Sequence, residues 1–171
     1  MTLITWVQQM RIGEVAVFSP PGNEKEIFIK SICNNVESAN ERICFGRFLV
    51  NEQLSLHLYG ISIDKNETSI SWDMLSSKIL GYVFIFRWDD HDSLDTIKDV
   101  LDYFAENYTA PIIVLASVDD KSAIPLPDKL YGPGGLSIDR NIRFQFCQIT
   151  DPVSSKKIVV NIIDMLLENM Q

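Results

Sequence analysis

The sequence predicts an α/β protein in which helices cover both faces of a mainly parallel, six-stranded sheet. Apolar runs alternate with amphipathic stretches along the chain, and this alternation is typical of a three-layer sandwich. Residues 81–88 and 110–116 are apolar almost throughout, as strands covered on both faces usually are. Only three residues separate the runs at 43–50 and 54–59, which favours a hairpin and places one antiparallel strand at an edge of the sheet.

The remaining elements follow from the spacing of apolar residues. Strands are predicted at 14–19 and 142–147, and helices at 24–33, 71–80, 92–108 and 153–170. Asp92 is a candidate N-cap for the third of these helices. The Pro- and Gly-rich stretch 125–135 is predicted to be a loop. We expect a single domain over residues 14–171, preceded by an N-terminal extension at 1–13.

Composition excludes several classes of function. The net charge is −8 and no basic run is present, so a nucleic-acid partner is not expected. No apolar run reaches the roughly 18 residues that span a bilayer. The three cysteines, Cys33, Cys44 and Cys147, are scattered among apolar neighbours and are predicted to be buried free thiols, which suits a cytoplasmic location.

Several short motifs occur in a particular order along the chain. Residues 45–47 are FGR, residues 56–60 are LHLYG, residues 72–75 are WDML, and Gly81 opens the next strand. In order and spacing these resemble the Ras superfamily of small GTPases, closest to its gliding-motility (MglA-type) branch, which is itself similar to Arf-like proteins. The resemblance implies a P-loop NTPase-like fold and a site for a guanine nucleotide with Mg²⁺.

The segment that matches the phosphate-binding loop departs from its pattern, G-x-x-x-x-G-K-[ST]. Ser19 replaces the first glycine and Glu24 the second, with Gly22 between these two positions. Lys25 is retained, and Glu26 replaces the hydroxyl residue. A carboxylate 4 Å from a phosphate costs about 1 kcal/mol in water and about 4 kcal/mol at an effective dielectric constant of about 20. One alternative is that Glu26 binds Mg²⁺ directly, as carboxylates do.

The other four family elements are altered as well. Residues 36–44 lack the threonine of the first switch and are interpreted as a plain loop. The element after the third strand has Gly60 in place of the aspartate, Ile63 in place of the glycine, and Asp64 where the water-orienting glutamine would lie. In the base-recognition motif Asp120 is kept, but Ser117 replaces the first residue of the family pattern. The last family motif corresponds to a segment that ends at Thr150.

We therefore expect no catalytic residue, no metal and no cofactor, and our hypothesis is a pseudo-GTPase that binds a protein. The resemblance suggests a roadblock/LC7-type partner or a GTPase-related complex in signalling or polarity, and homo-oligomers are compatible with it. The candidate interface residues are Phe45, Arg47, His57, Tyr59 and Trp72.

Two alternatives stay open at this stage. One is a divergent protein that binds GTP, GDP or ATP weakly with Mg²⁺ through Lys25 and Asp120. The other is a pocket that holds another small ligand or is filled by the chain's own Glu24 or Lys25. The carboxylates of residues 89–92 are interpreted as a solvated loop and helix cap rather than as metal ligands.

Overall fold

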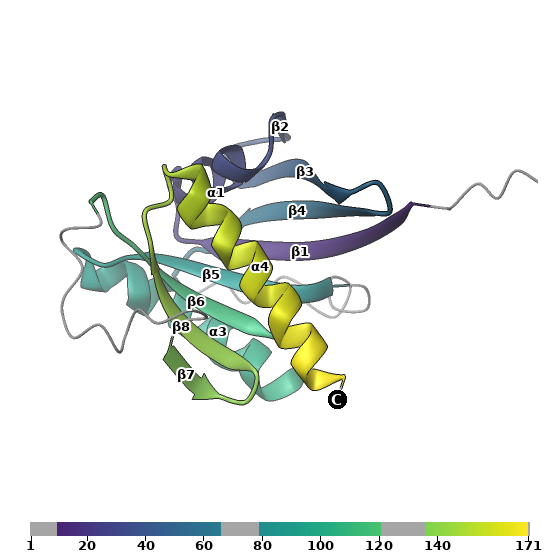
Figure 1. Ribbon diagram of the computed structural model, residues 1–171. Helices are drawn as coiled ribbons and strands as arrows, with labels where there is room; N and C mark the ends of the chain where they lie inside the picture. Colours follow the sequence, from purple (N-terminus) through teal and green to yellow (C-terminus); the bar gives the residue numbers. More distant parts are fainter. Residues whose placement is uncertain (1–9, 66–78, 121–135, 171) are drawn as a thin grey trace, which may run out of the picture.

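The computed structural model describes residues 10–65, 79–120 and 136–170. The strands in these ranges are β1 (Arg11–Ser19), β2 (Val36–Ser38), β3 (Ile43–Asn51), β4 (Leu54–Ser62), β5 (Ile79–Arg87), β6 (Ile112–Ser117), β7 (Leu136–Asp139) and β8 (Ile142–Cys147). The helices in the same ranges are α1 (Glu24–Ile32), α3 (His91–Asn107) and α4 (Pro152–Asn169). Figure 1 shows their arrangement.

All eight strands form one mixed sheet with the order β2-β3-β4-β1-β5-β6-β8-β7. The five central strands, from β4 to β8 in this order, are parallel to one another. The outer strands are antiparallel to theirs: β3 to β4, β2 to β3 and β7 to β8. The predicted hairpin of β3 and β4 is therefore confirmed, and the chain is an α/β protein. The expectation of a single antiparallel strand at an edge is wrong, because β2 lies outside β3 and β7 is a further antiparallel strand at the opposite edge.

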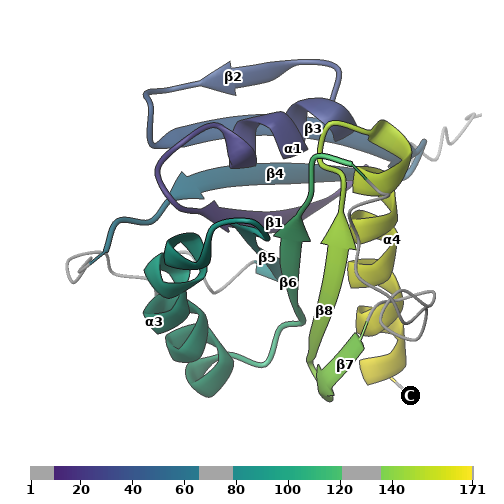
Figure 2. The ribbon, with the colours of Figure 1, turned by 90° about the vertical axis from the view of Figure 1, so that its left-hand side faces the viewer.

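Helices lie on both faces of the sheet, with α1 and α4 on one side and α3 on the other (Figure 2). The side chains of β1 alternate between two hydrophobic cores. Val15 and Val17 pack in the core under α1 and α4, whereas Ala16 and Phe18 pack in the core under α3. Because both faces are buried in the second half of β1, residues 15–18 form an unbroken apolar run rather than an alternating one.

The predicted number of six strands is wrong, because two short edge strands complete the sheet. β2 lies inside the segment 36–44 that was expected to be a plain loop, and it pairs Val36 with Gly46 and Ser38 with Cys44 of β3. β7 pairs with β8 at the opposite edge. Strands of three or four residues are too short to show a period of two in the sequence, so the sequence pattern did not predict them.

Helix boundaries also differ from the prediction. Asp90, not Asp92, caps α3, and its Oδ1 accepts a hydrogen bond of 3.1 Å from the Asp92 amide. Ile79 and Leu80, expected at the end of a helix over 71–80, belong to β5, where Ile79 pairs with Glu14. The rest of that predicted helix, the whole of the predicted loop at 125–135 and residues 1–9 of the predicted extension lie outside the described residues.

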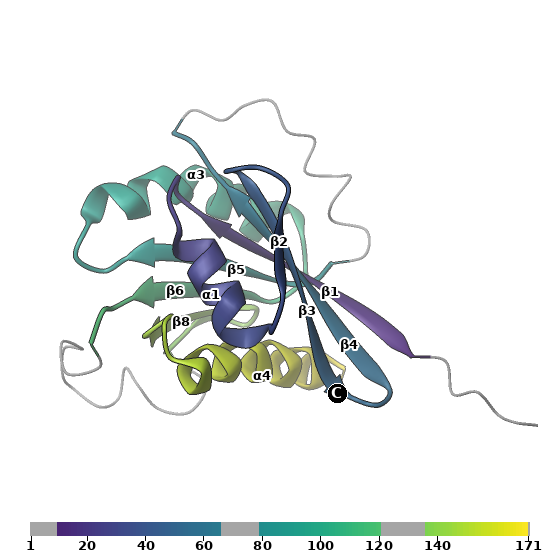
Figure 3. The same cartoon turned by 90° about the horizontal axis from the view of Figure 1, so that it is seen from above.

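Viewed from above, β1 and β4 run side by side and end at the same edge of the sheet (Figure 3). The segment from Ser19 to α1 starts at this edge, as do the segments that follow β5, β6 and β8. Ligands of open α/β sheets bind beyond the carboxyl ends of the strands. This edge is therefore where a functional site is to be sought.

Candidate functional site at the carboxyl ends of the strands

The segment that joins β1 to α1 is a tight turn with a buried start. Ser19 is fully buried, and its hydroxyl donates a hydrogen bond of 3.1 Å to the carbonyl oxygen of Pro20. Gly22 has φ = 141°, a conformation that side-chain-bearing residues rarely adopt. A Cβ atom placed on Gly22 would lie 2.7 Å from Oε2 of Glu24, but this carboxylate ends a flexible side chain, so the positive φ is what requires the glycine.

Lys25 is buried at the start of α1, and its side chain is only 2 % exposed. Its ammonium donates hydrogen bonds of 3.2 Å to the carbonyl oxygen of Gly22 and 3.1 Å to that of Glu41. Burying a charged group is unfavourable unless it is hydrogen-bonded, and these carbonyl oxygens supply that compensation. The lysine therefore joins the turn after β1 to the segment before β3.

Glu24 lies beside the same turn and pairs with a residue of another strand. Its Oε1 atom is 3.5 Å from Nη1 of Arg87, which ends β5. The Arg87 guanidinium also donates to Asp89 through Nε at 3.4 Å. Asp89, and after it Glu24 and Asp119, raise the pKa of Arg87 above its ordinary value, because each places a carboxylate near the guanidinium. Glu24 is thus ion-paired with Arg87, whose side chain is 45 % exposed, so its charge is only partly compensated.

Glu26 pairs along α1 with Lys30. The Lys30 ammonium lies 2.9 Å from Oε1 of Glu26, and the Ser38 hydroxyl donates to the same oxygen at 3.3 Å. The hydrogen bond from Lys30 holds the pKa of the Glu26 carboxyl below its ordinary value, and Ser38 adds to this effect. The carboxylate that was considered as a Mg²⁺ ligand therefore already has two partners. Among the described residues, no group of three His, Cys, Asp or Glu side chains is placed to hold a metal ion.

Gly60 lies within β4 rather than after it, and the positions from Gly60 to Asp64 make core and surface contacts. Gly60 pairs with Cys44 on β3, and an added Cβ would lie 3.0 Å from Ile29 and collide with the Cys44 sulfur. Ile63 is fully buried in the core under α3, and its amide donates to the Ser19 carbonyl oxygen at 2.8 Å. The carboxylate of Asp64 lies 4.0 Å from the Arg42 guanidinium at the surface.

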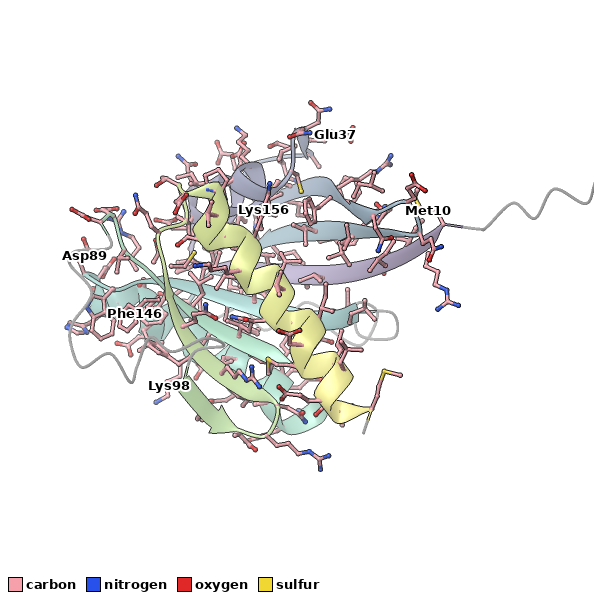
Figure 4. The ribbon with its side chains drawn as sticks, viewed as in Figure 1. Met10, Glu37, Asp89, Lys98, Phe146 and Lys156 are labelled. Atoms are coloured by element: carbon pink, nitrogen blue, oxygen red, sulfur yellow. The ribbon has the colours of Figure 1, made fainter. Side chains whose placement is uncertain are left out.

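A small pocket of about 140 Å³ opens where β5 and β6 end. Ser117 and Asp120 line it, together with Arg87, Trp88, Asp89, Val118 and Asp119. The Trp88 ring packs edge-on against Phe146, with ring centroids 4.8 Å apart. Figure 4 shows Asp89 and Phe146 at this same end of the molecule. Thr150 is exposed in the turn before α4.

Four of the five candidate interface residues come together on β3 and β4. The Phe45 ring lies 5.3 Å from that of His57 and 5.1 Å from that of Tyr59, while the Arg47 guanidinium lies 5.4 Å from the Phe45 centroid. The Tyr59 hydroxyl donates to Glu14 at 3.0 Å. Burial, followed by this carboxylate, raises the pKa of Tyr59. We call these four residues the aromatic cluster; Trp72 lies outside the described residues.

Sequence reasoning missed the partners that complete the site. Glu41 acts only through its backbone, so its side chain gave no indication of the contact with Lys25. Arg87 had a usable signal, because it is the one charged residue in the run GYVFIFRW at 81–88. Glu14, the partner of Tyr59, is similarly a charged residue at the start of an apolar run.

No protein-family model matches this chain, and no curated protein matches it either. Within the described ranges, no helix combines the length and the apolar character that crossing a membrane requires.

Proposed function

We propose that residues 14–171 form a GTPase-like domain of the P-loop class that does not turn over nucleotide and serves as a protein-interaction module. The connection of a buried parallel strand, β1, through a glycine-containing turn to α1 supports this fold assignment. The hairpin of β3 and β4 and the five parallel strands agree with the resemblance carried by residues 45–47 and 56–60.

The observation that carries the proposal is the position of the Lys25 ammonium. In a phosphate-binding loop this lysine meets the β- and γ-phosphates. Here it is hydrogen-bonded to the carbonyl oxygens of Gly22 and Glu41, so a phosphate would have to replace both contacts. Glu24 adds a carboxylate next to the same turn, which disfavours a polyanion. A phosphate site filled by the chain's own groups is the result.

The aromatic cluster supports the proposed role as a protein-interaction module. Its members are half-buried or, for Arg47, exposed, and they lie side by side on neighbouring strands. Aromatic and arginine side chains are enriched among the residues that dominate protein–protein binding. The partner expected from the resemblance is a roadblock/LC7-type protein or another member of a GTPase-related complex.

Capture of partners at native expression levels tests the interaction. We expect a partner that wild-type chain recovers to be lost with Phe45→Ala and with Arg47→Ala. Arg47 is exposed, so its variant removes the surface contact without disturbing the core. Lys98→Ala, an exposed change on α3, is the control and should recover the same partner (Figure 4). If the wild-type chain and all three variants recover the same set of proteins, the aromatic cluster is not the interaction surface.

The pocket lined by Ser117 and Asp120 supports one alternative, a divergent nucleotide-binding protein, because the resemblance assigns base recognition to residues 117–120 and the pocket lies beyond the carboxyl ends of the strands. Acid extraction of freshly purified chain, followed by chromatography of the extract, separates the two functions. The proposal predicts far less than one nucleotide per chain. About one equivalent of GDP or GTP per chain would replace the proposal by the alternative.

A further inference from the structure

The outward face of α4 carries an apolar stripe. Val153, Val160 and Leu167 are 61 %, 53 % and 55 % exposed. They are spaced by seven residues, so they lie along one side of the helix, two turns apart. The inward face of α4 is already buried on the sheet through residues such as Ile158 and Ile162. The stripe therefore contributes little to the fold, and it makes α4 apolar on both faces.

Charged side chains accompany the stripe, with opposite signs at its two ends. Lys156 and Lys157 lie near the beginning of α4, whereas Asp164 lies near its end. All three are exposed. The Lys156 ammonium lies 5.7 Å from the centroid of the Phe48 ring on β3. Figure 1 shows α4 crossing the front of the molecule, and Figure 4 places Lys156 near its first turn.

We propose that this stripe is the contact surface for a second copy of the chain, with the two α4 helices antiparallel about a two-fold axis at Val160. In that arrangement Val160 meets its own copy. Val153 and Leu167 are each seven residues from Val160, on opposite sides, so each faces the other across the axis. Lys156 and Asp164 are each four residues away, so an ammonium meets a carboxylate on both sides of the axis.

The self-complementarity of the stripe is what selects a second copy as the occupant. A two-fold interface requires that each residue find its match in the same surface of the partner. The two-fold axis at Val160 gives both the apolar residues and the charged residues their matching partners. A parallel pair would instead place Lys156 against Lys156 and Asp164 against Asp164, which is unfavourable.

The contact is small, so the dimer is expected to be weak. α4 has 18 residues, and such a helix is about 27 Å long at about 1.5 Å per residue. A pair of single helices buries less than the roughly 1,200 Å² at which stable interfaces begin. We therefore expect a dissociation constant of about 10–100 μM. The inference rests on α4 alone and does not depend on the proposed function.

Sedimentation equilibrium over about 5–500 μM tests the dimer. Wild-type chain should pass from monomer to dimer in this range. Val160→Glu should stay monomeric, because it places two carboxylates against each other at the axis. Ile138→Glu, a change at a residue 59 % exposed on β7, is the matched control and should dimerise like wild type. A wild-type chain that is monomeric throughout, or a Val160→Glu chain that dimerises normally, overturns the proposal.

Cysteine cross-linking tests the register. A disulfide needs Cβ atoms about 3.5–4.5 Å apart, and the native cysteines in the structure are buried. Val160→Cys should therefore cross-link to itself, whereas Ile138→Cys should not. Val153→Cys and Leu167→Cys should cross-link efficiently only when the two variants are mixed. Efficient cross-linking of Val153→Cys with itself would indicate a parallel pair and contradict the proposed axis.

A charge swap tests the ion pairs. Because the dimer is two-fold symmetric, Lys156→Asp places a carboxylate opposite Asp164 in both ion pairs. This variant should weaken the dimer about 5- to 10-fold. The double variant Lys156→Asp/Asp164→Lys restores opposite charges in exchanged positions, so its dissociation constant should return to the wild-type value. A double variant as weak as Lys156→Asp alone would show that these side chains do not face each other.

Discussion

The ammonium of Lys25 lies 3.1 Å from the backbone carbonyl oxygen of Glu41 and joins α1 to the segment before β3. The same group donates to Gly22 at 3.2 Å, so three separate parts of the chain meet at one buried charge. This arrangement gives the retained lysine a structural role that needs no nucleotide. The proposal of a self-filled phosphate site depends on it.

Replacing Lys25 should destabilise the fold. Lys25→Met keeps the length of the side chain but leaves the carbonyl oxygens of Gly22 and Glu41 without their donor. We expect the free energy of unfolding to fall by about 1–3 kcal/mol, measured by urea denaturation. Lys98→Met on the surface of α3 is the control and should change it by less than about 0.5 kcal/mol. A Lys25→Met chain as stable as the control would show that the buried contacts do not stabilise the fold.

Glu26 should contribute to the pH dependence of stability. The Lys30 hydrogen bond lowers the pKa of the folded-state carboxyl from its ordinary value of 4.5. A carboxyl with a lowered pKa stabilises the fold above its unfolded pKa, and this contribution is lost as the pH falls through the folded pKa. Glu26→Gln should therefore be less stable than wild type at neutral pH, and the difference should vanish in acid.

Urea denaturation at about pH 7, 5 and 3 measures this difference. Glu37→Gln removes an exposed carboxyl on β2 and changes the net charge equally, so it is the matched control (Figure 4). The deficit at neutral pH should stay below about 1 kcal/mol, because the pair is partly exposed. A deficit that persists unchanged at the lowest pH would contradict the assignment to the Glu26 carboxylate.

Gly60 should tolerate alanine only when space is made for it. An added Cβ collides with the Cys44 sulfur and lies 3.0 Å from Ile29, so Gly60→Ala should cost about 1–3 kcal/mol. Cys44→Ala removes the sulfur in question. The double variant should therefore lose less stability than the two single variants together, as a double-mutant cycle measures. Purely additive losses would mean that the sulfur is not the obstacle.

The buried thiols should be unreactive in the folded chain. Burial raises the pKa of Cys33 to about 11 and also raises that of Cys44, because a thiolate is poorly solvated there. Cys147 is buried as well. A thiol reagent at about pH 8 should therefore label these residues only in denaturant. Rapid labelling of Cys33 or Cys44 under native conditions would contradict their burial.

The sequence was most informative where burial is complete. The runs at 81–88 and 110–116 are apolar because β5 and β6 are covered on both faces, and this signal does not depend on distant residues. β2 and β7 are defined by pairing with their neighbours rather than by their own composition. A pattern within a segment therefore predicts the centre of the sheet better than its edges.

At the candidate site, the sequence identified the residues but not their contacts. Glu24, Lys25 and Glu26 were singled out because they depart from or retain a motif. The partners Arg87 and Glu41 come from other strands and loops, and only the sheet order brings them to the same edge. Ile63 was singled out because it replaces the glycine of a family element, and the structure adds that its side chain belongs to the core under α3.

Isothermal titration calorimetry of the purified chain with GTP, GDP and ATP in the presence of Mg²⁺ tests the central claim most directly. A phosphate site filled by Lys25 and Glu24 predicts no saturable heat at nucleotide concentrations up to about 1 mM, where a dissociation constant in the micromolar range would be evident. Saturable micromolar binding that Lys25→Ala abolishes would show instead that the lysine releases its carbonyl partners for a phosphate.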